Sequence, residues 1–321
     1  MKVLVTGGAG FIGSNLVKWL IHDDRISAVK VLDNLETGFF ANIARFKDHP
    51  KFEFIEGDIR HLAICIGAAE GMDIISHQAA LGSVPRSVKD PVTTHEVNAT
   101  GTLNVFTAAR ENNIRRVVYA ASSSAYGDHP GLPKVEDKIG TPISPYGVTK
   151  LMNEVYAKVF AQLYNIEFIG LRYFNVYGPH QNPAGPYAAV IPQFIKAFLE
   201  NHSPVINGDG RHSRDFTFVD DVVQANLLAM FTSNLAAVNQ VYNIAKGEQT
   251  TLNELFSLLK KISGREISAM HGPERTGDIR HSLADITKAK TLLGYQPSVS
   301  PEEGLKKTYH WYAENSFIFA A

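Results

Sequence analysis

Cysteine is nearly absent from this sequence, since Cys65 is the only one among 321 residues. A single cysteine excludes an internal disulfide and a metal site built from several thiolates. We therefore expect Cys65 to be a small packing residue, we assign no residue to a metal site, and we predict a protein suited to a reducing compartment.

An excess of one charge is also lacking, because 31 basic residues stand against 32 acidic ones. This balance gives no electrostatic footprint for nucleic acid or an anionic membrane, so an anionic ligand must be held by local groups. No stretch approaches the roughly 20 apolar residues that cross a bilayer. The apolar N-terminal run stops at Thr6 and opens into glycines rather than a signal-peptide cleavage site. We expect a cytoplasmic protein without nucleic-acid or membrane partners.

Short β-branched runs are plentiful in the first half of the chain. They alternate with longer segments that have helical spacing, and this order predicts parallel strands joined by right-handed crossovers in a doubly wound α/β sheet. The expected strands cover residues 2–6, 29–33, 52–58, 73–77, 116–121 and 167–172.

Glycines follow the first expected strand directly, at Gly7, Gly10 and Gly13. They allow a tight turn and a close approach to a pyrophosphate, whose charge meets the unpaired N–H groups of the next helix. Asp33 ends the second expected strand and can accept hydrogen bonds from ribose hydroxyls, and Glu36 adds a second negative charge. A 2′-phosphate would be repelled, so the pattern predicts NAD rather than NADP.

The regular alternation of strands and helices is expected to stop after residue 177. Glycine and proline clusters interrupt it, and helices are expected near residues 252–262 and 301–312 without regular strands between them. We predict a Rossmann-like NAD-binding domain over residues 1–177, with a later return near 214–246. A smaller mixed domain, mainly residues 178–321, would bind substrate over the mouth of the sheet.

Polar residues also stand where the third and fourth expected strands end. Asp58 follows the third strand, and residues 77–80 follow the fourth. Ligands of open α/β sheets bind at such carboxyl ends. For His77, however, a buried structural role is favoured over a catalytic one.

Two tyrosines precede a lysine by four positions, but their contexts differ. Tyr146 and Lys150 follow Pro145 in a segment with helical spacing, where their β-carbons would lie about 6 Å apart. Tyr242 and Lys246 belong to an alternating, strand-like segment, where they would lie roughly 13 Å apart. Only the first pair is therefore expected to act together.

The Tyr146 phenol would be a poor base by itself, because a free phenol titrates near pH 10. The Lys150 ammonium and the positive nicotinamide ring would stabilise its phenolate and lower its pKa. Ser122, Ser123 and Ser124 end the fifth expected strand, beside the expected nicotinamide. The arrangement predicts acid–base catalysis by Tyr146, with a serine hydroxyl holding the substrate oxygen.

These residues, in this order, resemble the extended short-chain dehydrogenase/reductase family along essentially the whole chain. Five stretches are similar to bacterial UDP-N-acetylglucosamine 4-epimerases: HQAALGSVPRS, AASSSAYGDHPGLPKVED, LRYFNVYGPHQNPAGPYAAVIP, INGDGRHSRDF and GDIRHSLADITKA. The resemblance implies interconversion of UDP-GlcNAc and UDP-GalNAc through a transient 4-keto sugar with permanently bound NAD⁺, serving polysaccharide synthesis. It also implies a homodimer built on a four-helix bundle. The N-terminal extension of many such epimerases is lacking, which we expect to leave the chemistry unchanged.

The resemblance assigns roles residue by residue. Tyr146 would be the catalytic acid/base beside Lys150, and the three serines are alternatives for contact with the sugar O4. The cofactor contacts would be Gly7, Gly10, Phe11, Ile12, Gly13, Asp33, Asn34, Thr37, Gly38, Asp58, Ile59, Gln78, Ala79, Ala80, Asn98, Ser122, Tyr146, Lys150, Tyr173 and Val176. The UDP-sugar contacts would be Gly82, Ser83, Ser123, Asn175, Ala189, Val190, Asn207, Arg214, Arg280 and Ser282.

Within the UDP-sugar set, the two arginines would meet diphosphate or ribose oxygens, as suits their planar forks. An ion pair between Arg214 and Asp215 is the structural alternative. The small residues Gly82, Ser83 and Ser282 would leave room for an N-acetyl group.

Three other functions compete with this one. A nucleotide-sugar 4,6-dehydratase or a UDP-glucuronate decarboxylase needs an acid where this chain has Ser124 and Ala125. A UDP-glucose or UDP-glucuronate 4-epimerase is a nearer alternative, separated by pocket shape and by a cation for the C6 carboxylate. A non-catalytic NAD sensor would not need Tyr146, Lys150 and the serines together.

Overall fold

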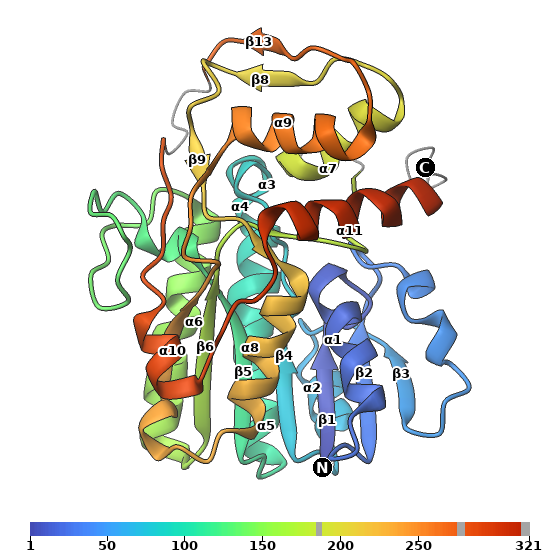
Figure 1. Ribbon diagram of the computed structural model, residues 1–321. Coiled ribbons are helices and arrows are strands. Elements are labelled where there is room, and N and C mark those ends of the chain that lie inside the picture. Colours follow the sequence, from blue (N-terminus) through green and yellow to red (C-terminus); the bar gives the residue numbers. More distant parts are fainter. Residues whose placement is uncertain (184–187, 275–279, 316–321) are drawn as a thin grey trace.

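A seven-stranded parallel sheet forms the centre of the protein, as the computed structural model shows for residues 1–183, 188–274 and 280–315 (Figure 1). The strand order is β11-β6-β5-β4-β1-β2-β3, and every neighbouring pair is parallel. The doubly wound α/β class predicted from sequence is confirmed. The strands are β1 (Lys2–Thr6), β2 (Ala28–Asp33), β3 (Phe52–Glu56), β4 (Ile74–His77), β5 (Arg116–Ser122), β6 (Glu167–Tyr173) and β11 (Gln240–Ile244).

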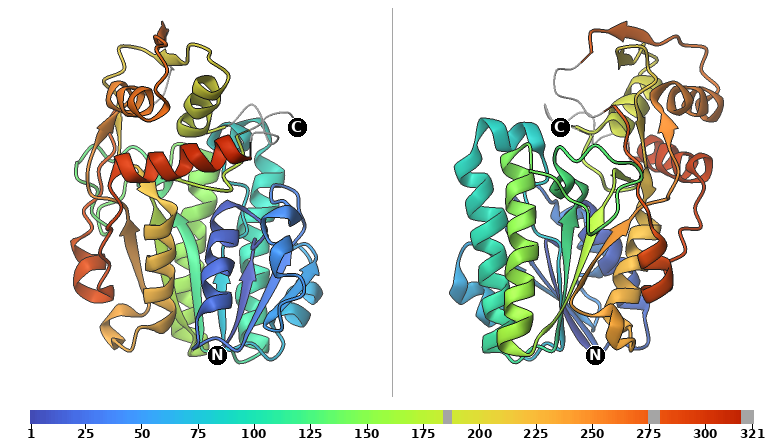
Figure 2. Two further views of the ribbon diagram at one scale, coloured as in Figure 1. Left: turned by 45° about the vertical axis from the view of Figure 1, so that its right-hand side comes forward. Right: turned by 90° about the vertical axis from the view of Figure 1, so that its left-hand side faces the viewer.

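Helices cover both faces of this sheet (Figure 2). One face carries α1 (Phe11–His22), α8 (Val219–Phe231) and α10 (Thr287–Leu293). The other carries α2 (Leu62–Ala69), α5 (Gly101–Glu111) and α6 (Pro145–Tyr164). A continuous helical run leads into α5 through α4 (Pro91–His95) and a π-helical turn, and α3 (Val84–Lys89) precedes it.

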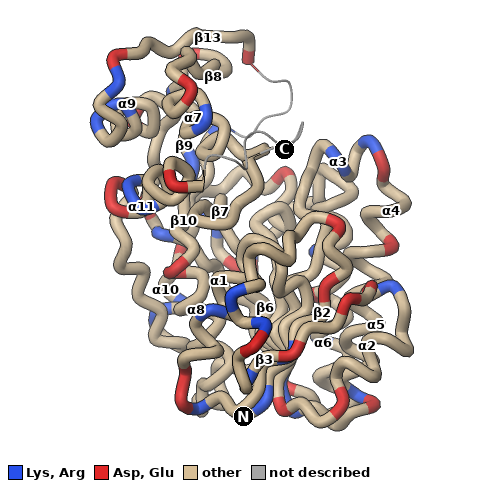
Figure 3. The backbone as a smooth tube through the Cα atoms, turned by 90° about the vertical axis from the view of Figure 1, so that its right-hand side faces the viewer, with Lys and Arg blue, Asp and Glu red and all other residues tan. Residues whose placement is uncertain are grey.

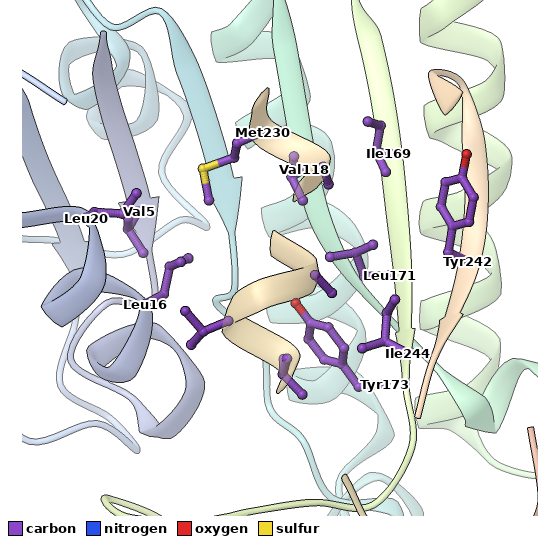
Figure 4. Close-up of a cluster of buried hydrophobic side chains, with 14 of the residues drawn as sticks. Val5, Leu16, Leu20, Val118, Ile169, Leu171, Tyr173, Met230, Tyr242 and Ile244 are labelled. Atoms are coloured by element: carbon purple, nitrogen blue, oxygen red, sulfur yellow. The ribbon is translucent and has the colours of Figure 1, made fainter. Parts of the chain in front are cut away.

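The core has two halves because side chains alternate between the faces of a strand. On β1, Val3 and Val5 pack toward α1 and α8, whereas Leu4 packs toward α2 and α5. Figure 4 shows part of the first half, where Val5 and Leu16 lie opposite each other between β1 and α1. The inner strands are therefore buried on both faces, which explains their apolar runs, whereas the edge strand β3 has two exposed glutamates.

Local signals define the ends of α6. The Ser144 hydroxyl accepts a hydrogen bond from the Gly147 N–H at 3.1 Å, and Pro145 occupies the first turn, where its missing N–H is not needed. Asn165 ends the helix in the left-handed conformation with φ 52°. The helix thus starts at the residue before Tyr146, which places that tyrosine at the carboxyl edge of the sheet.

A second group of elements lies above the carboxyl ends of the strands, with its own apolar core around Phe194, Phe198, Leu255 and Leu305 (Figure 1). Its strands are short and pair two by two. Helix α9 carries a capping box between Thr251 and Glu254. The group comprises β7 (Val176–Tyr177), β10 (Thr217–Phe218), α7 (Val190–Leu199), β8 (Val205–Asn207), β13 (Met270–Gly272), β9 (Ser213–Arg214), β12 (Thr250–Thr251), α9 (Leu252–Ser263) and α11 (Pro301–Glu314).

Acidic and basic residues are interspersed along the chain rather than gathered in one region (Figure 3). Among the helices of the described residues, none combines the length and the apolarity needed to cross a membrane.

Candidate active site

A large cavity at the carboxyl edge of the sheet lies where the strand order reverses. The chain proceeds from β1 outward to β2 and β3, and then returns to place β4 on the other side of β1. The ends of β1 and β4, at Thr6 and His77, flank a cavity of about 500 Å³. Such a reversal point is where open α/β sheets bind ligands.

The glycine turn between β1 and α1 forms one wall of this cavity. Gly7 has φ +70°, and a β-carbon there would lie 2.6 Å from the Ala79 nitrogen. A β-carbon at Gly13 would lie only 2.1 Å from the Gly7 carbonyl oxygen. Helix α1 starts at this turn without a side-chain cap, so its first N–H groups are available to an anion. The turn fits the pyrophosphate of a dinucleotide.

Asp33 at the end of β2 holds the glycine turn from the side. Its carboxylate accepts hydrogen bonds from the Ala9 N–H at 2.9 Å and the Leu35 N–H at 2.8 Å. Burial raises the pKa of Asp33, while these donors and the Gly10 N–H lower it. Asp33 therefore supports the turn in addition to lining the cavity where a ribose would lie.

Asp58 is fixed by two neighbours beside the same wall. Arg60 donates to both of its oxygens, at 3.1, 3.0 and 2.6 Å, and the Asn34 amide donates at 2.9 Å. The bonds from the Arg60 side chain lower the pKa of Asp58 to about 2. Asn34 and Asp58 both line the cavity, as does Glu36. This end is acidic, which suits ribose hydroxyls and disfavours a phosphate on them.

Tyr146 and Lys150 lie together on the opposite wall, on one face of α6. The Lys150 Nζ is 5.9 Å from the centroid of the Tyr146 ring and donates a hydrogen bond to the Ala120 carbonyl at 2.8 Å. Both residues line the cavity. The helical spacing therefore brings the pair into the cleft, as predicted.

The second tyrosine–lysine pair has no common site. The Tyr242 hydroxyl donates to the Ala237 carbonyl at 2.8 Å, whereas the Lys246 ammonium donates to the Pro297 carbonyl at 3.1 Å. Strand β11 ends at Ile244, earlier than expected.

The predicted lowering of the Tyr146 pKa depends on the nicotinamide ring as well as on Lys150, and it stays a prediction. Burial raises the pKa of Tyr146, and the Ser122 hydroxyl only partly opposes this effect. Burial also lowers the pKa of Lys150 to about 8, although the negative charge of the Glu154 carboxylate acts to raise it. Desolvation is therefore the largest effect on the pKa of both groups. The positive nicotinamide ring invoked by the prediction would favour the phenolate when bound.

The three serines occupy the end of β5 and the short helix η4 (Ser123–Tyr126), and all three line the cavity. The Ser122 Oγ accepts a hydrogen bond from the Ser124 N–H at 3.1 Å and also interacts with the Tyr146 phenol. Ser122 therefore has partners within the protein on both sides.

A triangle of hydrogen bonds joins Gln78, Tyr173 and Asn226 at the floor of the cavity. The Tyr173 hydroxyl donates to Gln78 Oε1 at 3.0 Å and accepts from Asn226 Nδ2 at 2.9 Å. Gln78 Nε2 donates to Asn226 Oδ1 at 3.0 Å, which closes the triangle. Two of the expected cofactor residues, Gln78 and Tyr173, are held rigidly in this way.

His77 does not line the cavity. Its ring is bonded to the hydroxyls of Thr6 at 2.7 Å and Thr102 at 2.9 Å. Burial lowers the pKa of His77 to about 3, and the Lys150 ammonium adds to the effect. A buried, neutral histidine with both ring nitrogens bonded favours the structural role.

A second cavity, of about 310 Å³, lies above the first. Five of the expected UDP-sugar residues line it, although they come from distant parts of the chain: Asn175, Ala189, Val190, Asn207 and Arg214. The two cavities share Asn175, Val176 and Gln181 as lining residues. Gly82, expected to border the sugar, lines the first cavity.

Three other expected UDP-sugar residues line neither cavity. The Ser83 hydroxyl caps α3 by accepting from the Arg86 N–H at 3.2 Å. The Arg280 side chain is 71% exposed and lies 3.4 Å from Glu274. Ser282 packs along β9 through a backbone bond to Ser213 at 3.1 Å.

Two expected cofactor residues also lie behind the cavity wall. The Asn98 amide bonds both to the N–H of Leu81 at 2.8 Å and to its carbonyl at 3.1 Å, so it shapes the loop after β4. At Gly38 a β-carbon would lie 2.7 Å from the carbonyl carbon of Ala9, so this glycine supports the first turn.

The sequence reasoning missed Gln181, which lines both cavities. Its amide nitrogen makes a long 3.3 Å bond to the Val176 carbonyl. The signal was available, because Gln181 lies within one of the stretches that carry the family resemblance. Residues 184–187 and 277–279 of those stretches lie outside the described residues.

Comparison with known proteins gives matches along the whole chain. The NAD dependent epimerase/dehydratase family matches residues 3–245. A putative UDP-glucose 4-epimerase from Methanocaldococcus jannaschii is 40% identical over 316 residues, covering 98% of this chain and 99% of that protein.

Solved structures of similar proteins agree. The UDP-N-acetylglucosamine 4-epimerase from Methanobrevibacter ruminantium M1, in complex with UDP-N-acetylmuramic acid, is 39% identical with a TM-score of 0.92, covering 98% of each chain. The UDP-glucose 4-epimerase from Thermotoga maritima, with UDP-glucose, is 39% identical with a TM-score of 0.91, covering 98% of this chain and 100% of that one.

Proposed function

Because the chain belongs to the NAD-dependent epimerase/dehydratase family, we propose that it is a UDP-sugar 4-epimerase that acts on UDP-GlcNAc and UDP-GalNAc. NAD is the cofactor of the family, as the glycine turn and Asp33 predicted. The observation that carries the proposal is the Tyr146–Lys150 pair at the rim of a dinucleotide cavity that continues into a second cavity.

In this proposal, bound NAD⁺ supplies the acceptor, and on the return step the donor, of a hydride at the sugar C4. Tyr146 removes the proton of the 4-hydroxyl as the hydride leaves C4, and it returns the proton to the C4 oxygen when the hydride returns to the opposite face of C4. Lys150, 5.9 Å from the phenol ring centroid, favours the phenolate while the proton is away. Ser123 or Ser124 holds the 4-oxygen, because the Ser122 oxygen already has partners in the protein.

The nucleotide end would be bound firmly and the sugar end loosely, since C4 has to present each of its two faces in turn to the hydride carrier. We assign the UDP group to the second cavity, where Arg214 and Asn207 offer polar groups. NAD would be bound by residues 1–177 with the return near 214–246, and the UDP-sugar mainly by residues 178–321.

Room at the sugar end supports the acetylated substrates. Gly82 and Ala189 border the two cavities without bulky side chains. A β-carbon at Gly82 would meet no atom within 4 Å, so there is space for an N-acetyl group beside it.

UDP-glucose is the second candidate substrate, because two relatives of 40% and 38% identity are named a putative UDP-glucose 4-epimerase and a UDP-glucose 4-epimerase. A dehydratase is less well supported. Ala125, at a position where that chemistry needs an acid, is a fully buried apolar residue.

The test is a panel of UDP-Glc, UDP-GlcNAc and UDP-GlcA incubated with the purified protein and no added NAD, with C4 inversion followed by NMR. We expect inversion of UDP-GlcNAc to UDP-GalNAc at the highest kcat/KM. Faster inversion of UDP-Glc would show that UDP-Glc, rather than UDP-GlcNAc, is the preferred substrate. Loss of water from the sugar would show that the protein is a dehydratase rather than an epimerase.

We also propose that two copies associate through α6. Val148, Val155, Val159 and Leu163 form an exposed apolar stripe along this helix. Sedimentation should show a dimer that Val155→Glu weakens. Val205→Glu is the matched control, because Val205 is similarly exposed on β8, at 52% against 58%. A monomeric parent protein would refute this association.

A further inference from the structure

Asp215 lies at the junction of three chain segments beside the second cavity. It is completely buried, in the short segment between β9 and β10. Its carboxylate accepts hydrogen bonds from the backbone N–H groups of Lys246 at 3.0 Å, Gly247 at 3.1 and 3.2 Å, and Ala284 at 3.1 Å. One side chain thus fastens the loop after β11 and the segment before α10 to the segment that follows β9.

The backbone of Asp215 is tied to a fourth segment. The Asn175 amide donates a hydrogen bond to the Asp215 carbonyl at 3.1 Å. Asn175 has φ +35°, in the left-handed region that residues other than glycine rarely adopt, and it lines both cavities. The contact with Asp215 therefore helps to hold an unfavoured backbone at the boundary between the two cavities.

The same junction places Arg214, whose side chain lines the second cavity. Its Nη1 donates to the Ser213 carbonyl at 3.0 Å and to the Arg280 carbonyl at 3.3 Å. Residues 280–284 run beside β9, with backbone bonds between Ser213 and Arg280 at 3.0 Å and between Ser282 and Ser213 at 3.1 Å. The bond from Ala284 to Asp215 anchors the far end of this segment.

Burying the Asp215 carboxylate at this junction costs desolvation free energy. Burial raises the pKa of Asp215 to about 6, although the backbone N–H groups of Ala284, Gly247 and Lys246 lower it. The side chain is therefore ionised at neutral pH in spite of its burial. Buried charges of this kind are concentrated at functional sites. The cost is consistent with a role in the site rather than in folding alone.

From these contacts we propose that Asp215 is a positioning residue for the nucleotide end of the substrate: it holds Arg214 and Asn175 where the uridine diphosphate group binds. The proposal rests on the proposed function, because it assumes that a nucleoside diphosphate occupies the second cavity. Asp215 itself does not touch the substrate and acts only through the groups that it fastens.

The test is Asp215→Asn with UDP itself as the probe. Asparagine offers one oxygen and would direct its NH₂ group at N–H groups that now donate to the other oxygen, so one side of the junction should loosen. We expect calorimetry to show UDP binding at least about tenfold weaker, equivalent to about 1.4 kcal/mol. The KM for the UDP-sugar should rise by the same factor, while kcat changes less than about threefold and bound NAD is retained.

Asp221→Asn is the matched control. Asp221 is also buried and accepts a backbone hydrogen bond, from Ser298 at 2.9 Å, but it lines neither cavity. It should lower the melting temperature without weakening UDP binding. Equal losses of UDP affinity in the two variants would overturn the positioning role, as would wild-type affinity in Asp215→Asn.

If Asp215→Asn fails to fold, Asp215→Glu decides by the same criterion, because it keeps the charge and moves the oxygens by one methylene. The outcomes also separate the two proposals. A parent protein that does not bind UDP refutes the proposed function, and the positioning role with it. If the parent protein binds UDP and both Asp215 variants bind it with the same affinity, only the positioning role is refuted.

Discussion

Replacing Lys150 by methionine should separate stability from catalysis. Lys150 is 4% exposed, and its ammonium donates a 2.8 Å hydrogen bond to the Ala120 carbonyl. Burial lowers the pKa of Lys150 from its usual 10.5 to about 8, which corresponds to about 3 kcal/mol against the charged form. Methionine keeps the apolar stem and loses one hydrogen bond of about 1 kcal/mol. We expect the variant to be about 2 kcal/mol more stable than the parent at pH 7.

The pH dependence follows from the direction of the shift. The pKa of Lys150 in the folded state, about 8, is lower than its usual 10.5, so the unfolded chain binds more protons between these values. The contribution of Lys150 to stability is therefore fully present above pH 10.5 and is lost as the pH falls through 8. The advantage of Lys150→Met should be largest near pH 7 and should fade toward pH 10.

The assay is urea unfolding of both proteins at pH 7, 8, 9 and 10, with their NAD content matched. Turnover of the UDP-sugar is measured in parallel and should fall at least about 100-fold. Lys158→Met, which removes an exposed lysine from the same helix, is the control and should show no pH-dependent difference. The reasoning is refuted if Lys150→Met is less stable than the parent at pH 7 or if the difference between them does not vary with pH.

Two other substitutions test the supports of the site. Gly13→Ala would place a β-carbon 2.1 Å from the Gly7 carbonyl oxygen, so the turn must move by about 1 Å and bound NAD should be lost. Gly67→Ala is the control and should keep its NAD, because a β-carbon at Gly67 would have nothing within 4 Å. NAD content is measured after denaturation, and a full content in Gly13→Ala would disprove the close packing. Glu154→Gln leaves the Arg172 guanidinium, held at 2.8 and 2.7 Å and 4% exposed, without its carboxylate. It should lower the unfolding free energy by about 3–5 kcal/mol, while Glu111→Gln in an exposed pair changes it by less than about 1 kcal/mol; equal effects of the two would count against the buried pair.

The parts of the site that lie close together in sequence could be predicted. The glycine turn needs only the strand before it and the helix after it, and Tyr146 and Lys150 are joined by one turn of α6. The strand ends were expected within about two residues because apolar runs stop where the chain leaves the buried sheet.

The parts that depend on contacts between distant segments could not be placed. Strand β11 ends before Lys246 because the Asp215 carboxylate takes the N–H groups of Lys246 and Gly247. Asn98 turns its amide to Leu81 instead of the cavity, and nothing local in the sequence indicates that partner. The pKa of Tyr146 depends on burial by the surrounding chain, which helical spacing does not report.

The most direct measurement compares Tyr146→Phe with the parent in C4 inversion of UDP-GlcNAc, followed by NMR without added NAD. Phenylalanine preserves the ring that lies beside Lys150 and removes only the hydroxyl. We expect the variant to keep its NAD and to lose at least about 100-fold in turnover, since the proton of the 4-hydroxyl then has no acceptor. A variant that inverts the sugar at the rate of the parent protein would show that this phenol is not the acid–base group.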